Sequence, residues 1–382
     1  MKFFHLSDLH IGKNVYGFSM IEEQKHVFEQ IMMYINTERP AAVVIAGDVY
    51  DRAVPSTDSV RLFDIFLTDL AKENVAVMLI SGNHDSPERL HFASRLLSDK
   101  QLFLYGTFDG TLQKVTLPDE YGAVHFWLLP FIKPPMLRGM FGNREIESYD
   151  DALVAALDAA NVDYTLRNVL VSHQFYVKSG VESLRSESEL DPVGGLDSVN
   201  VEIIERFDYV ALGHLHRQQS VGSEHIRYCG SPIKYSFSEW RHDKSVTVVE
   251  MGEKGNCVFR FLPLTPLHDM REIKGTLEAL MSSEVYSLAD KEDYLRIILT
   301  DEDEIIDPMG KLRSIYPHIM SLTFENARTN VDVGAITANA EKMKTLSVHD
   351  LFGEFFLEIQ GSVMSGEQSK IISELLEKDV EK

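Results

Sequence analysis

Residues 1–12 read MKFFHLSDLHIG, a short apolar run that stops at a polar turn. The run Lys2–Leu6 has the length of one strand and is apolar at most positions, which is typical of a strand buried on both faces of a sheet. Asp8 and His10 follow it directly. Because open α/β sheets form their binding sites just past the carboxyl ends of the strands, we expect both side chains to lie in such a site.

The same order of apolar run and polar turn recurs along the first 265 residues. Further apolar runs of this kind lie at residues 42–46, 75–80, 169–171 and 209–212. Apolar residues at helical spacing in residues 21–35 and 57–70 predict two helices between the early runs. Other runs are not separated by long helices, at residues 123–129, 226–229, 245–251 and 257–262. The pattern predicts an α/β fold in which two facing sheets form a sandwich flanked by helices.

Five short motifs stand where predicted strands end. They are Asp8-Leu9-His10, Gly47-Asp48-Val49-Tyr50-Asp51, Gly82-Asn83-His84-Asp85, His173 and Gly213-His214-Leu215-His216. Each motif alone is common on protein surfaces, but their joint occurrence after apolar runs indicates one site. Carboxylate, imidazole and amide ligands without thiolate suit divalent ions such as Mn²⁺, Fe²⁺ or Zn²⁺. Such a set can hold two ions that share a bridging carboxylate, an arrangement used for phosphoester displacement.

The composition sets limits on the partners of the protein. The chain has 382 residues, 44% hydrophobic and 25% charged, with 37 basic against 59 acidic side chains and a formal net charge of −22. Bulk charge of this sign opposes binding to nucleic acid or an anionic membrane, so action on DNA would require metal ions or a partner to supply cations.

We expect a cytoplasmic protein with no membrane partner. No apolar run approaches the ~18–20 residues that a membrane span needs. The first residues are too short and polar for a signal peptide. Cys229 and Cys257 are the only cysteines, which is too few for a disulfide framework.

Proline residues at positions 263 and 266 mark a domain boundary, and we expect domains at 1–265, 266–345 and 346–382. Apolar runs at 294–300 and 319–324, with a helix at 307–315 between them, predict a small α+β domain. The last region is predicted to be helical and to carry an apolar stripe, formed by Leu351, Phe352, Phe355, Phe356 and Ile359. The stripe either binds a partner or packs on its own domain. The acidic segment 180–195 is either a solvated loop or a loop that contacts substrate.

Through the motifs DLH, GDVYD, GNHD, SHQ and GHLH, residues 1 to about 260 resemble the calcineurin-like metallophosphoesterase superfamily. The resemblance implies seven ligands for two metal ions, most simply Mn²⁺. They are Asp8, His10 and His216 at one ion, Asn83, His173 and His214 at the other, and Asp48 shared by both. It further implies that His84 protonates the leaving oxygen and that Asp51 orients His84. Asp85 is expected to cap the following helix.

Longer strings are similar to one branch of that superfamily, the nuclease subunits of bacterial DNA-end-processing complexes. The strings include GDVYDRAVPSTDSVRLF, SGNHDSPERLHFASRLL and YCGSPIKYSFSEWRHDKSVTVVEM. The resemblance implies 3′→5′ exonuclease action on double-stranded ends and endonuclease action on single strands and hairpins, in DNA replication, repair and recombination. It also implies that the region from residue 266 is a capping domain and that the apolar stripe binds a coiled-coil ATPase subunit. A homodimer through the helices near 21–35 and 57–70 is consistent with the resemblance, and the alternative is that the same helix faces are part of the core.

Two other functions fit parts of the pattern. A phosphodiesterase or phosphatase of the same fold could act on a small nucleotide, although an uncovered apolar stripe has no use in such an enzyme. A catalytically inert scaffold would require a broken ligand set, and none of the seven ligands is missing. The sequence therefore favours the DNA phosphodiesterase.

Overall fold

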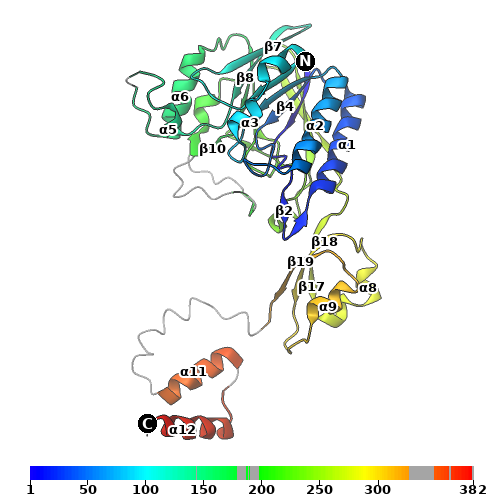
Figure 1. The fold of residues 1–382 in the computed structure, drawn as a ribbon, viewed down its shortest axis with the longest axis vertical. Coiled ribbons are helices and arrows are strands. Elements are labelled where there is room, and N and C mark those ends of the chain that lie inside the picture. The colour runs from blue at the N-terminus through cyan, green and yellow to red at the C-terminus, as the bar shows by residue number, and fades with distance from the viewer. Residues whose placement is uncertain are drawn as a thin grey trace. The chain divides into compact units, whose positions relative to one another are not determined.

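The computed structural model describes residues 1–142, 144–178, 186–187, 189, 198–326, 348–360 and 363–380. It divides into two compact units, Met1–Asp269 and Met270–Lys382 (Figure 1). The first unit contains two six-stranded sheets, and the second contains a three-stranded sheet and the C-terminal helices. Among the helices of the described residues, none has the length and apolar character to cross a membrane.

The first sheet has the strand order β16-β15-β1-β4-β5-β6. Its strands are β1 (Lys2–Leu6), β4 (Ala42–Ala46), β5 (Ala76–Ile80), β6 (Leu102–Tyr105), β15 (Ser245–Met251) and β16 (Cys257–Pro263). The strands β1, β4, β5 and β6 are parallel, whereas β15 runs antiparallel to β1 and β16 antiparallel to β15. The carboxyl ends of β1, β4 and β5 therefore meet at one edge.

The second sheet has the strand order β13-β14-β12-β9-β8-β7. Its strands are β7 (Gln113–Asp119), β8 (Gly122–Leu129), β9 (Arg167–Ser172), β12 (Tyr209–Leu212), β13 (Gln219–Val221) and β14 (Ser223–Tyr228). Parallel pairing joins β8, β9, β12 and β14, and the two outer strands are antiparallel to their neighbours. Two small ribbons lie beside the sheets: β2 (Asn14–Val15) with β3 (Phe18–Ser19), and β10 (Phe175–Val177) with β11 (Ser198–Asn200).

An apolar core fills the space between the two sheets. Alternate residues of a strand face opposite sides, and in β9 the side chains of Val169 and Val171 enter the core between the sheets while Leu170 enters a second core on the outer face. Phe3 of the first sheet meets Phe126 of the second edge to face, with ring centroids 5.3 Å apart. The predicted two-sheet α/β sandwich is thereby confirmed.

Helices cover the outer faces of this sandwich. The helices of the first unit are α1 (Ile21–Glu38), α2 (Thr57–Lys72), α3 (Pro87–His91), α4 (Ser94–Leu97), α5 (Pro134–Leu137) and α6 (Tyr149–Ala160), with short 3₁₀ segments at Ser98–Lys100, Val201–Ile204 and Phe237–Glu239. The neighbouring helices α1 and α2 (Figure 1) stack Phe28 on Phe66 at 4.4 Å. Ser56 begins α2 as its N-cap, since its hydroxyl accepts from the Ser59 N–H.

The second unit is built on three parallel strands: β17 (Met270–Gly275), β18 (Tyr294–Leu299) and β19 (Ile319–Phe324). Its helices are α7 (Leu277–Leu280), α8 (Ser283–Tyr286), α9 (Pro308–Arg313), α11 (Val348–Gln360) and α12 (Gly366–Val380). The strand β17 was not predicted. The division of units falls at Asp269, later than the proline pair, because Thr265 and Leu267 still bond to Gln30 and Glu23 of α1.

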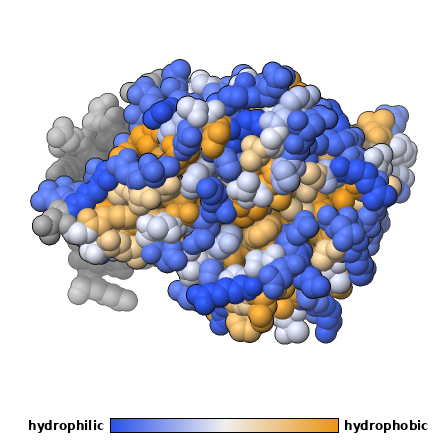
Figure 2. Space-filling view, turned by 90° about the horizontal axis from the view of Figure 1, so that it is seen from above, coloured by the Kyte–Doolittle hydropathy of each residue, from blue (hydrophilic) through white to orange (hydrophobic). Residues whose placement is uncertain are grey.

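Apolar side chains also reach the surface. Figure 2 shows a face on which hydrophobic patches are broken up by hydrophilic side chains. Exposed apolar residues of the first unit include Met33 on α1, Val60 and Ile65 on α2, Phe92, and Leu96 on α4. The solvent-facing sides of α1 and α2 therefore carry exposed apolar side chains.

Candidate metal centre

Seven side chains from the loops after β1, β4, β5, β9 and β12 lie together, and we call them the donor cluster. They are Asp8, His10, Asp48, Asn83, His173, His214 and His216. The first four come from the first sheet and the others from the second. Within the first sheet, the Gly47 carbonyl accepts from the Asp8 N–H. Two contacts join the two edges: the Asp8 carboxylate accepts from the His214 N–H, and His173 Nδ1 lies 2.7 Å from the carbonyl oxygen of Ala46. All seven predicted ligands are thus brought to one place.

Four residues of the donor cluster have a left-handed backbone. The φ angles are 53° at Asp8, 42° at His10, 51° at Asp48 and 104° at His214. Backbone of this kind costs ~1–3 kcal/mol for each residue that is not glycine and is concentrated at functional sites. The surrounding fold therefore holds these four residues in a backbone conformation that they would not adopt by themselves, which fixes the positions of their side chains.

Glycines allow the loops to approach one another. At Gly47, where φ is +90°, a Cβ atom would lie 2.4 Å from His173 Nδ1. At Gly82, it would lie 2.1 Å from Asp48 Oδ1. Both distances are too short for a side chain, so the glycines beside the ligands are required by the close packing of the cluster.

The atoms of the donor cluster are arranged as metal ligands are. His10 Nε2 lies 3.0 Å from His216 Nε2, and Asn83 Oδ1 lies 3.1 Å from both His173 Nε2 and His214 Nδ1. Three overlapping groups have ligand atoms within 4.8 Å of one another: Asp8, His10 and His216; His10, Asp48 and His84; and Asp8, Asp48 and His173. Nitrogen and oxygen donors in buried groups of this kind fit divalent ions.

Burial and mutual attraction shift the pKa values in the cluster in opposite directions. Burial raises the pKa of Asp8. At Asp48 burial also acts upward, but the charge and hydrogen bond of His173, together with His10 and His84, outweigh it and hold the pKa well below its usual range. Burial acts downward on His173, but Asp48, together with Asp8 and the Ala46 carbonyl, outweighs it, so that the pKa of His173 rises to about 9. Buried carboxylates here require positive charge, which metal ions would supply in place of the proton on His173.

His84 stands beside the donor cluster and is more accessible than its members, with a side chain 19% exposed. Its ring Nδ1 lies 3.0 Å from the main-chain oxygen of Asp51, and its Nε2 lies 4.0 Å from Asp48. The Asp51 carboxylate instead contacts Lys13 at 2.8 Å. The contact between Asp51 and His84 is therefore made by the Asp51 carbonyl oxygen and not by its side chain.

Asp85 has a different role from the helix cap expected from the sequence. Its carboxylate accepts from three main-chain N–H groups, those of Val49, Tyr50 and Gly82, at 2.9–3.1 Å. Burial, and then the charge of Asp48, raises its pKa to about 6 despite these bonds. The N-cap of α3 is Ser86. Asp85 thus ties the loop after β4 to the loop after β5 and fixes the spacing of Asp48 and Asn83.

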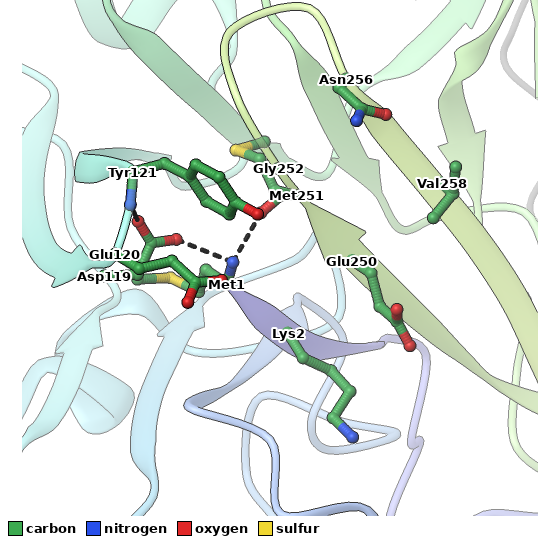
Figure 3. Close-up of a pocket in the computed structure, with 10 residues that line it drawn as sticks. All are labelled: Met1, Lys2, Asp119, Glu120, Tyr121, Glu250, Met251, Gly252, Asn256 and Val258. Atoms are coloured by element: carbon green, nitrogen blue, oxygen red, sulfur yellow. Dashed lines mark hydrogen bonds and ion pairs between the residues drawn. The ribbon is translucent and has the colours of Figure 1, made fainter.

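A cavity of about 560 Å³ lies at the amino end of β1, where Met1 and Lys2 line it, whereas the donor cluster follows the carboxyl end of that strand. Figure 3 shows the Met1 amino group joined to Asp119 and to the carbonyl of Met251, at 2.7 and 2.5 Å. Arg167 binds the same Asp119 carboxylate. Among the charged groups that line the cavity, Lys2 pairs with Glu38 and Glu250 with Arg260. Among the described residues, those that line the cavity form no set of metal-binding side chains like the donor cluster, so we assign the chemistry to that cluster.

Comparison with known proteins gives the same class as the fold and the cluster. Residues 1–218 match the family model of the calcineurin-like phosphoesterases, and residues 266–360 match the model described as the type 5 capsule protein repressor C-terminal domain. The chain therefore belongs to the calcineurin-like phosphoesterase family, whose members hydrolyse phosphoesters with metal ions.

Curated relatives define the branch. The chain is 33% identical over 326 residues to the SbcD subunit of the SbcCD nuclease from Staphylococcus epidermidis, covering 85% of each chain. It is 30% identical over 380 residues to the SbcD subunit from Staphylococcus saprophyticus, covering 98% of each. Within its family, the chain is thus a member of the SbcD group.

Solved structures that align with this chain are more distant. A dimetal phosphatase from Danio rerio aligns at 13% identity with a TM-score of 0.39, covering 69% of this chain and 98% of that one. A phosphopantetheinyl hydrolase from Mycobacterium tuberculosis aligns at 16% identity with a TM-score of 0.38, covering 68% and 95%.

Proposed function

We propose that this chain is the nuclease subunit of an SbcCD complex and hydrolyses DNA phosphodiesters with two divalent ions. The observation that carries the proposal is the convergence of the donor cluster, in which buried ligand atoms approach within 4.8 Å in overlapping groups. The Staphylococcus relatives, which carry the name of this nuclease subunit, support DNA as the substrate. The proposal places the protein in the cytoplasm.

Within this proposal the donor cluster forms two metal sites. Asp48 is shared, because its Oδ2 lies 3.2 Å from His173 Nε2 and 3.7 Å from His10 Nε2, on the two sides of the cluster. Asp8, His10 and His216 complete one site. Asn83, His173 and His214 complete the other. Two bound ions, taken to be Mn²⁺, would supply a Lewis acid and activate a water.

His84 is proposed to protonate the leaving oxygen. The Asp51 carbonyl accepts from Nδ1, which orients the ring and leaves Nε2 to face the substrate. The main-chain N–H of His84 donates to Asp48 Oδ1 at 2.9 Å and so fixes the ring next to the metal ligands. General acids held in this way contribute ~10²–10⁴-fold to rate.

A direct assay tests the nuclease proposal. With Mn²⁺, the isolated chain is expected to degrade linear duplex DNA from 3′ ends and to cut single strands and hairpins, and ATP should matter only when SbcC is present. Chelation by EDTA should stop cleavage, and added Mn²⁺ should restore it. Rapid hydrolysis of cyclic nucleotides with DNA left intact would contradict the proposal and favour the small-nucleotide phosphodiesterase.

The helix α11 is proposed to bind the coiled coil of SbcC. Phe352 and Phe355 are 37% and 55% exposed, and Leu351 and Phe356 are half-buried. The side chain of Ile359 lies outside the described residues. The amino end of α11 is held to α12 through His349 Nε2 and Ser369 Oγ, 3.0 Å apart. An apolar stripe with this spacing suits a groove in a helical partner.

The double change Leu351→Glu and Phe355→Glu is expected to abolish co-purification with SbcC. Two carboxylates on the stripe would have to be desolvated in an apolar groove, which is costly. Nuclease activity of the isolated chain should persist, because the donor cluster lies in the other unit. Leu288→Glu, which alters an 80% exposed leucine outside the stripe, is the matched control and should leave the complex intact. An unchanged complex in the double variant would place the stripe in the protein's own core.

A homodimer through α1 and α2 also belongs to this proposal. The support for it is the exposed apolar surface of these helices, where Met33 is 67%, Val60 46% and Ile65 51% exposed. A second copy that covers this surface would remove it from water.

A further inference from the structure

A buried ion pair lies directly behind His216. Glu239, at the end of the 3₁₀ segment Phe237–Glu239, is fully buried, and Lys244, just before β15, is 7% exposed. Glu239 Oε2 accepts from Lys244 Nζ at 2.6 Å, while its Oε1 lies 3.5 Å from His216 Nδ1. Burying a carboxylate and an ammonium is costly, and replacing such a pair by apolar side chains is often neutral or stabilising. Stability alone therefore does not explain why this ion pair is buried here, and we look for a functional role.

Both charged groups are held in positions from which they contact His216. Lys244 Nζ also donates to the main-chain oxygen of His216 at 2.9 Å and to Ser231 Oγ at 2.8 Å, which uses all three of its N–H groups. Glu239 Oε1 accepts from Ser236 Oγ at 3.1 Å and from the Tyr235 N–H at 3.3 Å. The carboxylate is thereby fixed from three sides. Lys244 is hydrogen-bonded to the main chain of His216, and the Glu239 carboxylate faces the imidazole ring of His216.

The consequence for the ring is a defined tautomer. A carboxylate at Nδ1 favours the proton on that nitrogen and leaves the lone pair on Nε2. His216 Nε2 points into the donor cluster, 3.0 Å from His10 Nε2. Metal-bound histidines commonly donate their second N–H to a carboxylate, which orients the ring and raises its basicity.

We propose that Glu239, held by Lys244, is a positioning residue that orients His216 to bind one of the two metal ions. The proposal rests on the proposed metal-binding role of His216 and adds a residue pair to it. It predicts an effect centred on one metal site, because Glu239 reaches the donor cluster through the ring of His216, which is assigned to one ion only.

Titration of metal-free protein with Mn²⁺ tests the proposal. Glu239→Gln is expected to weaken one of two Mn²⁺ sites by ~10–100-fold and to leave the other within a few-fold. Because this variant leaves Lys244 charged and unpaired, the double variant Glu239→Gln with Lys244→Met removes both charges and should fold while showing the same loss. In a His216→Ala background, Glu239→Gln should cause no further loss. Long-range ¹H–¹⁵N NMR should show that the double variant no longer has a single Nδ1–H tautomer at His216.

Glu23→Gln is the matched control. Glu23 is also buried and also contacts a histidine, with 2.6 Å between its Oε1 and His268 Nδ1, but His268 is outside the donor cluster. This variant should bind both ions as the wild type does. If a folded Glu239 variant binds Mn²⁺ at both sites with wild-type affinity, the positioning role of Glu239 is wrong, while the proposed function is unaffected. Failure of the wild-type protein to bind two ions would instead overturn the proposed function.

Discussion

Replacing Asp48 by asparagine is expected to abolish binding of both Mn²⁺ ions while the fold is kept. The Asp48 carboxylate lies between the two sets of ligands, 3.2 Å from His173 Nε2 and 3.7 Å from His10 Nε2. An amide carries no charge to attract two dications and offers one oxygen where the carboxylate offers two. The loss of affinity should exceed the ~10–100-fold that follows removal of a group behind a ligand. Calorimetric titration with Mn²⁺ measures it, and DNA cleavage should disappear with the ions.

The same variant has a second readout in the metal-free protein. Burial lowers the pKa of His173, and the Asp48 carboxylate is the main group that offsets this, so that with Asp8 and the Ala46 carbonyl the pKa is raised to about 9. Without that carboxylate, burial should dominate and the pKa of His173 should fall, which an NMR titration of its ring detects. Asp208→Asn is the control, because Asp208 pairs with Lys254 at 2.7 Å and precedes β12 at its amino end. Two ions bound normally by Asp48→Asn would show that Asp48 is not shared.

Replacing His84 by alanine is expected to leave both metal ions in place and to slow DNA cleavage by ~10²–10⁴-fold. The physical reason is that the ring lies at the exposed side of the cluster, with Nδ1 held by the Asp51 carbonyl and Nε2 4.0 Å from Asp48. It can deliver a proton without being a ligand. Mn²⁺ stoichiometry by titration and single-turnover cleavage of a short duplex, measured together, check both parts.

The control for His84 is a histidine remote from the loops. His225→Ala, on β14, removes only a 3.4 Å contact with the carbonyl of Glu205 and should cleave DNA at nearly the wild-type rate. Loss of one ion in His84→Ala would show that the group His10, Asp48 and His84 holds metal, and the acid role would then need another residue.

The sheets of the first unit could be predicted because their central strands are apolar on both faces. The predicted runs at 2–6 and 42–46 coincide with β1 and β4. By contrast, β17 has the sequence MREIKG, in which three of the six residues are charged and only Met270 is buried, so its sequence lacks that signal. The short ribbon strands β2 and β3 contain two residues each, which is too few for any periodicity.

The residues that bear donor atoms could be predicted from motifs, but the residues that hold them could not. Asp85 follows His84 directly and resembles an ordinary cap, and its three main-chain partners become neighbours only when the loops fold together. Glu239 lies in a segment with no metal-binding pattern, and only the fold brings it behind His216. For Asp51, the motif suggested His84 as its partner, and only the structure shows that the contact is made by the Asp51 carbonyl oxygen.

The donor cluster draws on loops that run from Asp8 to His216, near the beginning and toward the end of the first unit. Domains emerging from the ribosome fold as units once enough of the chain has been synthesised. A nascent or truncated chain that ends before residue 214 would lack part of each proposed site, namely His214 and His216. A chain that ends there would have neither proposed site complete, so metal-dependent activity would arise only after both sheets have assembled.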